Sequence, residues 1–281
     1  MCFYRSDGDS ILMVGFKTAA QMRALPTREL LLIIGHPGCG KSRFILSLAR
    51  YWELLHENAT VRIIDTEHGL SKLLKEQFAD IENVEIAEVN DADETIAAIS
   101  EVSELAKPDD WVCFESLGRN WEDSQDLASM TIVGMPKSEY LSQWLAKTKG
   151  KGSPVPQGDM YWQIAKDAHV RNVVNKLTRL SKKCHVLVTT TLPPEKPNFR
   201  GKNKTREEVA GFLGITVSPD GAPRNAYYFD TVVMMMQDNE GYWGSVLKDR
   251  GYTIDPDRFL ITDAYSDLIQ QRVNSVGERE Q

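Results

Sequence analysis

This sequence has no apolar run that approaches the roughly 20 residues needed to span a membrane as a helix. Its first residues also lack the pattern of a secretory signal peptide. The chain has 4 cysteines, and no two of them stand in the C-x-x-C spacing of a zinc or redox site. We therefore expect reduced thiols and a cytoplasmic protein that makes no membrane contact.

Metal-binding histidine clusters and excess positive charge are also missing. The 5 histidines show no ligand spacing, and we expect His169 on a helix surface and His185 at a strand edge. The formal net charge is −7, so the molecule as a whole does not attract nucleic acid electrostatically. Contact with DNA would therefore require a local basic patch.

The most informative feature present is GHPGCGKS at residues 35–42, which matches the phosphate-binding pattern G-x-x-x-x-G-K-[ST]. An apolar run at 30–34 precedes it and predicts a buried strand, while apolar residues at helical spacing over 41–58 predict a helix behind it. A glycine-rich turn that matches by chance is the alternative. The strand–loop–helix context favours a nucleoside triphosphate site.

Each residue type in this motif suits phosphate chemistry. Glycines let the backbone direct its N–H groups at phosphate oxygens, Lys41 should reach the β- and γ-phosphates, and the Ser42 hydroxyl should hold Mg²⁺. The nucleotide-binding residues expected here are Gly35, Pro37, Gly38, Cys39, Gly40, Lys41, Ser42 and Arg43.

Strands and helices alternate along the chain. Strands are predicted at 30–34, 61–65, 84–89, 111–114 and 186–190, with helices at 41–58, 94–105 and 167–182. This predicts an α/β fold whose mostly parallel, twisted sheet is flanked by helices. Closing strands are predicted at 228–236, 242–247 and 258–262, the first two as an antiparallel hairpin. We expect one domain over 1–281, with a core at about 29–252, long loops at 117–159 and 192–224, and a tail at about 264–281.

The order of these features resembles the RecA-fold P-loop ATPase core, which includes RecA recombinases, hexameric replicative helicases and RecA-core proteins of bacteriophages. The resemblance covers roughly residues 29–252, and the long tryptophan-containing segment at 117–159 looks most like phage-encoded members. It implies a hydrolase that uses ATP and Mg²⁺ and acts on single-stranded DNA in recombination, annealing or replication. It also implies a homo-oligomeric ring or filament with ATP sites at subunit interfaces, in the host cytoplasm if phage-encoded.

The resemblance assigns roles at three strand ends. Residues 64–69, IDTEHG, are similar to the recombinase stretch with the catalytic glutamate, so Glu67 would orient the attacking water; an acidic helix start is the alternative. Glu115 stands where the family usually has the Walker B aspartate and would hold Mg²⁺ through a water, although it could itself act as the base. Thr191, or its neighbour Thr190, matches the γ-phosphate sensor, without the usual glutamine.

Two basic segments match further family features. Lys248 and Arg250 form a K-x-R that would project to one side and reach the ATP of a neighbouring subunit; solvated charge at a hairpin end is the alternative. The loop beyond Thr191 carries cations beside an aromatic residue, which suits single-stranded DNA, although a solvated charged loop would look the same. Its candidate DNA-binding residues are Lys196, Phe199, Arg200, Lys202, Lys204 and Arg206.

Two other functional classes compete with this interpretation. A phosphotransferase would need a lid with paired arginines, and nothing in the sequence resembles one. A P-loop ATPase that moves or remodels a protein, without DNA, is the stronger rival because the chain is acidic overall.

Overall fold

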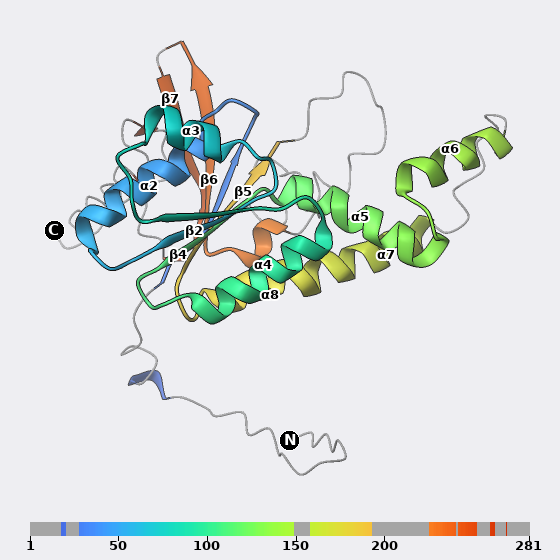
Figure 1. The fold of residues 1–281 in the computed structure, drawn as a ribbon, viewed down its shortest axis with the longest axis horizontal. Coiled ribbons are helices and arrows are strands. Elements are labelled where there is room, and N and C mark those ends of the chain that lie inside the picture. The colour runs from blue at the N-terminus through green and yellow to red at the C-terminus, as the bar shows by residue number, and fades with distance from the viewer. Residues whose placement is uncertain are drawn as a thin grey trace.

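The computed structural model describes residues 18–20, 28–148, 158–192, 225–239, 241–251, 259–261 and 268. Within these residues one 8-stranded sheet runs in the order β3-β2-β4-β5-β1-β6-β7-β8. All neighbouring strands from β3 to β6 are parallel, whereas β7 pairs antiparallel with both β6 and β8 (Figure 1). The predicted α/β class, with a mostly parallel sheet and a C-terminal antiparallel hairpin, is confirmed.

The strands agree closely with those predicted from the sequence. They are β1 (Leu30–Gly35), β2 (Val61–Asp65), β3 (Val84–Glu88), β4 (Trp111–Glu115), β5 (His185–Thr191), β6 (Thr231–Asp238), β7 (Gly241–Asp249) and β8 (Phe259–Leu260). Within the described residues the last closing strand is thus limited to two residues beside β7.

The helices cover both faces of the sheet, except α6 (Lys137–Thr148), which projects away from it (Figure 1). They are α2 (Lys41–Leu55), α3 (Leu70–Gln77), α4 (Ala92–Leu105), α5 (Leu117–Val133), α6 (Lys137–Thr148), α7 (Gly158–His169) and α8 (Asn175–Leu180). A π-helical turn, Val170–Val174, joins α7 to α8, and a short 3₁₀ turn, Asn225–Tyr228, precedes β6. No helix in the described ranges is long and apolar enough to cross a membrane.

The buried side chains of β1 alternate between two cores. Leu31 and Ile33 pack with the apolar side of α2 and α3, while Leu32 and Ile34 pack with α4, α5 and α8 on the other face. Since both faces are covered, the central strands β4, β5 and β1 are buried along most of their length, and β1 is apolar up to Gly35. Each fully buried leucine or isoleucine contributes about 1.5–3 kcal/mol. This rigid double-sided core fixes the position of the loops at its edges.

The prediction of a long loop over 117–159 is wrong, because α5, α6 and the beginning of α7 occupy its described part. Ser116 caps the start of α5, and Gly134, with φ 76°, ends it in the left-handed conformation. The buried side of α5 consists largely of small and polar residues, so it has no apolar stripe for hydrophobic periodicity to detect. These residues include Asn120, Ser124, Gln125, Ala128 and Ser129.

The helix predicted at 167–182 is confirmed in its centre but begins earlier, with α7. Its buried stripe includes Val173, Val174, Leu177 and Leu180. His169, expected on a helix surface, is instead 1% exposed and packs edge-on against Trp121 of α5. Tertiary packing of α5 on α7 buries a position that the helix alone would leave in solvent.

Burial of two histidines predicts a loss of stability in acid. Burial lowers the pKa of His169 to about 4 and, with Arg28 and His56 as further causes opposed by Asp109, that of His185 to about 4. The unfolded chain therefore accepts protons that the folded protein resists. The free energy of unfolding should be highest above pH 6.5 and should fall as the pH approaches 4, by about 3 kcal/mol through His169.

Urea unfolding at several pH values measures this effect. His169→Gln should flatten the pH dependence, whereas the same change at exposed His36 should leave the slope as it is. An unchanged slope in His169→Gln would show that the acid sensitivity originates elsewhere.

Candidate functional site

The chemistry-bearing residues predicted from the sequence meet at one edge of the sheet. In a parallel sheet the carboxyl ends of the strands lie along the same edge, where ligands of open α/β sheets bind. Gly35 at the end of β1 pairs in register with Thr191 of β5, and Asp65 at the end of β2 pairs with Glu115 of β4. The glycine-rich loop (residues 35–42), Glu67, Glu115 and Thr191 therefore belong to one region.

Three positions in the glycine-rich loop require glycine, and one of them is Gly38, whose φ of 83° is a left-handed conformation that would strain a side chain. Gly40, where α2 begins, has φ 92°, a left-handed conformation in which a side chain would be strained. At Gly35 an added Cβ would lie 2.3 Å from Cys39 Sγ and 2.7 Å from the Met235 carbonyl oxygen. The loop is therefore shaped by its backbone and by close contact with β6, as expected for a loop that presents N–H groups to a ligand.

Lys41 is held inside the glycine-rich loop. Its side chain is largely buried, and its ammonium donates hydrogen bonds to the carbonyl oxygens of Gly35 at 3.0 Å and His36 at 3.1 Å. The cation therefore lies within the concave side of the loop, where it can meet phosphate oxygens. Arg43, also assigned to the nucleotide, directs its guanidinium at Gln77 Oε1, 2.8 Å away on α3.

The two residues assigned to Mg²⁺ are in direct contact. The Ser42 hydroxyl donates a 2.7 Å hydrogen bond to Glu115 Oε1, although 73 positions separate them in the sequence. Glu115 is 2% exposed, and its other oxygen, Oε2, has no hydrogen-bond partner in the described part of the chain. The pKa of Glu115 is raised to about 7, mainly by burial and in smaller part by the nearby carboxylates of Glu67 and Asp65, while the hydrogen bond from Ser42 and the charge of Lys41 oppose the shift.

These groups fit a hard divalent cation. A buried carboxylate oxygen without a partner and an adjacent hydroxyl are oxygen ligands of the kind that Mg²⁺ prefers when phosphates and waters supply the rest. Over the described ranges no cluster of three or more His, Cys, Asp or Glu side chains could hold a metal ion.

Glu67 is fixed by two residues that the sequence analysis did not single out. The buried Asp65 carboxylate accepts hydrogen bonds from the backbone N–H groups of Glu67, His68 and Leu70, which shapes the turn after β2. The Ser116 hydroxyl donates to Glu67 Oε1 at 2.6 Å. The sequence hint for both was their position, since each lies at or directly after the end of a buried strand.

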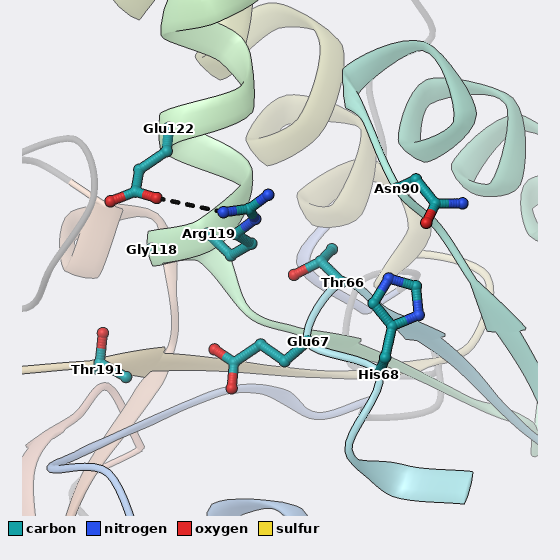
Figure 2. A pocket seen from close by; sticks show the side chains of 8 residues that line it. All are labelled: Thr66, Glu67, His68, Asn90, Gly118, Arg119, Glu122 and Thr191. Carbon is teal, nitrogen blue, oxygen red and sulfur yellow. Dashed lines mark ion pairs between the residues drawn. The ribbon is translucent and has the colours of Figure 1, made fainter. Parts of the chain in front are cut away.

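Glu67 and Thr191, the register partner of Gly35, border a cavity of about 480 Å³. Figure 2 shows Glu67 directed toward Thr191, with Arg119 and Glu122 of α5 on the opposite wall, paired at 3.6 Å. The remaining lining residues are Thr66, His68, Asn90 and Gly118. The cavity gives Glu67 access to solvent, and none of its lining residues except Glu67 and Thr191 was predicted as functional.

Lys248 and Arg250 lie at the amino ends of the parallel strands, opposite the ends that carry the glycine-rich loop. Lys248 pairs with Val232 near the start of β6, which runs parallel to β1, so both cations are far from the chain's own glycine-rich loop. They project to the same side, since the Tyr227 carbonyl accepts from Lys248 at 3.1 Å and from Arg250 at 3.3 Å.

The two cations differ in their surroundings. Lys248 donates to three backbone carbonyls, those of Ala226, Tyr227 and Phe229, and burial, followed by Arg250, lowers its pKa. The Arg250 side chain is 56% exposed and forms a 2.7 Å ion pair with Asp230. Lys248 therefore stabilises the entry to β6, whereas Arg250 is accessible.

The candidate DNA-binding residues, from Lys196 to Arg206, lie outside the described residues, as do most of the predicted segments 192–224 and 264–281. In the described part of the chain Cys39, Cys113 and Cys184 are buried and free, in agreement with reduced thiols.

No protein-family model matches this chain, and no curated protein matches its sequence. The class that the fold defines is α/β, with a mostly parallel sheet, and the motif at 35–42 lies at its carboxyl edge, where Ser42 contacts the buried Glu115 carboxylate.

Proposed function

We propose that this protein is a Mg²⁺-dependent ATPase of the RecA-fold class that acts on single-stranded DNA as an oligomer, in recombination, annealing or replication. The observation that carries the proposal is the convergence of Lys41, the Ser42–Glu115 pair and Glu67 at one sheet edge. They come from the ends of three different strands, and each has a distinct use in phosphoryl transfer.

The residues divide the reaction between them. Backbone N–H groups of the glycine-rich loop and the Lys41 ammonium stabilise negative charge on the β- and γ-phosphates. Ser42 and Glu115 would hold Mg²⁺, which when bound would neutralise charge on the phosphate oxygens. Glu67 orients and polarises the water that attacks the γ-phosphate.

The geometry favours Glu67 over Glu115 as the base. Glu115 is buried and one of its oxygens is engaged by Ser42. Glu67 is exposed on the cavity, where water has access, and one of its oxygens is held by Ser116. A carboxylate that must receive a proton from water needs such access, whereas a metal-holding carboxylate does not.

The position of Arg250 supports an oligomer. Because it lies at the edge opposite its own glycine-rich loop, it cannot serve the ATP bound to its own chain. In a ring or filament, the surface that carries Arg250 could pack against the nucleotide site of a neighbouring subunit. The accessible guanidinium would then reach the γ-phosphate bound there. The ATP sites would then lie between subunits.

The connection to DNA rests on chain continuity. Thr191 borders the cavity with Glu67 and leads directly into the segment that holds the basic residues and Phe199. A change at the γ-phosphate sensed by Thr191 would therefore be passed to a segment suited to single-stranded DNA. This supports a DNA role over the alternative, an ATPase that remodels a protein.

Steady-state ATP hydrolysis with and without single-stranded DNA tests the proposal. Turnover should rise several-fold with DNA. The double variant Lys202→Ala and Lys204→Ala should bind DNA more weakly, and the slope of log binding constant against log salt concentration should become shallower by about 1.4. The matched control removes two exposed cations of α3, Lys72 and Lys75, and should leave both quantities unchanged. If DNA does not change the turnover and no DNA binding is detected, the ATPase that remodels a protein would be favoured.

A further inference from the structure

Ser116 connects three parts of the candidate site. It follows β4 directly, it is the N-cap of α5, and it is fully buried. Its backbone N–H donates a 3.0 Å hydrogen bond to Thr66 Oγ1, and its hydroxyl donates to Glu67 Oε1 at 2.6 Å. A long contact of 3.5 Å from the Arg119 N–H to the same hydroxyl oxygen caps α5.

The hydroxyl belongs to a buried residue, whereas the Glu67 carboxylate would be free to rotate without it. Ser116 belongs to the packed sheet edge, but Glu67 is exposed and has three rotatable side-chain bonds. Holding a glutamate in one rotamer costs conformational entropy. A hydrogen bond from a buried donor to a carboxylate is strong enough to offset this cost.

We propose that Ser116 is a positioning residue for hydrolysis, which holds Glu67 Oε1 so that the other carboxylate oxygen faces the attacking water. This inference rests on the proposed function, in which Glu67 orients that water. Because Ser116 is held by Thr66 and Glu67 and not by the glycine-rich loop, it acts on turnover and not on nucleotide affinity. A misplacement of about 1 Å at a reacting group can cost roughly 100-fold in rate.

Three substitutions separate positioning from helix capping. Ser116→Ala removes the hydroxyl and the cap, whereas Ser116→Gly removes the hydroxyl but retains most of the capping preference. Ser116→Thr keeps a hydroxyl. The matched control is Asp91→Ala, which removes the cap of α4, where the Asp91 carboxylate accepts from the Glu94 N–H at 2.9 Å.

We expect kcat to fall at least about tenfold in both Ser116→Gly and Ser116→Ala, with KM for ATP within about twofold of the wild type. Ser116→Thr should recover most of the loss, and Asp91→Ala should lower the melting temperature without lowering kcat. In a Glu67→Gln background Ser116→Gly should cause no further loss, because the hydroxyl acts through that carboxylate.

An active wild type with unchanged kcat in Ser116→Gly would overturn the inference and leave the proposed ATPase intact. If Ser116→Gly lowers kcat by the same factor with and without Glu67→Gln, the inference would also be overturned, because Ser116 would then act independently of Glu67. A wild type that hydrolyses no ATP, with or without DNA, would refute the proposed function and the positioning role with it. If Ser116→Thr does not fold, the comparison of the glycine and alanine variants decides alone.

Discussion

Glu67→Gln is expected to bind ATP normally and to hydrolyse it about 100- to 10,000-fold more slowly than the wild type. The amide keeps the shape of the side chain and can still accept from the Ser116 hydroxyl, but it cannot take a proton from water. Any ATP-dependent assembly should therefore persist in this variant. Phosphate release at saturating ATP measures turnover, and a fluorescent nucleotide measures binding.

Glu115→Gln is the informative comparison. Its amide would face Ser42 at the metal site, so the variant should need more Mg²⁺ for half-maximal activity. Glu76→Gln, which removes an exposed carboxylate from α3, should behave like the wild type. If Glu67→Gln keeps near-normal turnover while Glu115→Gln loses it at every Mg²⁺ concentration, the roles of the two carboxylates are reversed.

Arg250→Ala is expected to lose about 10³- to 10⁵-fold in turnover while it binds nucleotide almost normally. The ion pair that it breaks, with Asp230, is largely exposed, so the fold should be little affected. Lys248→Ala is a poorer probe, because the Lys248 ammonium also stabilises three backbone carbonyls at the entry to β6. Asp230→Asn is the control, since it weakens the same ion pair and retains the guanidinium.

Mixing two inactive variants shows whether the site is shared between subunits. Lys41→Ala should abolish hydrolysis without unfolding the protein, because the Lys41 ammonium contacts the glycine-rich loop and not the apolar core. At a mixed interface the intact loop of an Arg250→Ala subunit would meet the intact Arg250 of a Lys41→Ala subunit. Partial recovery of ATPase activity is therefore expected.

Mixtures that remain inactive, although mixed oligomers are shown to form, would contradict a shared site. An active wild type that stays monomeric at every concentration, with ATP and DNA present, would contradict the oligomer itself.

Local sequence patterns predicted much of this fold, because they report short-range periodicity. The apolar run before Gly35 and the helical spacing behind Ser42 located β1 and α2, and alternation along the chain gave the α/β class. Glycine at positions 35 and 40 was required by local backbone geometry and close contact, which a motif can encode. The same patterns missed α5, because its buried side is small and polar.

By itself the sequence determined the strand–loop–helix unit and the strand ends that carry Glu67, Glu115 and Thr191. It also placed Lys248 and Arg250 on a hairpin near the C-terminal end of the fold. Only the tertiary structure decided that Ser116, 49 positions from Glu67, holds its carboxylate, and that Arg250 lies at the edge away from its own loop. The reason is physical: spacing along a chain specifies which face or end of an element a residue occupies. Which residues touch across elements depends on strand order and register, which the packing of both cores fixes.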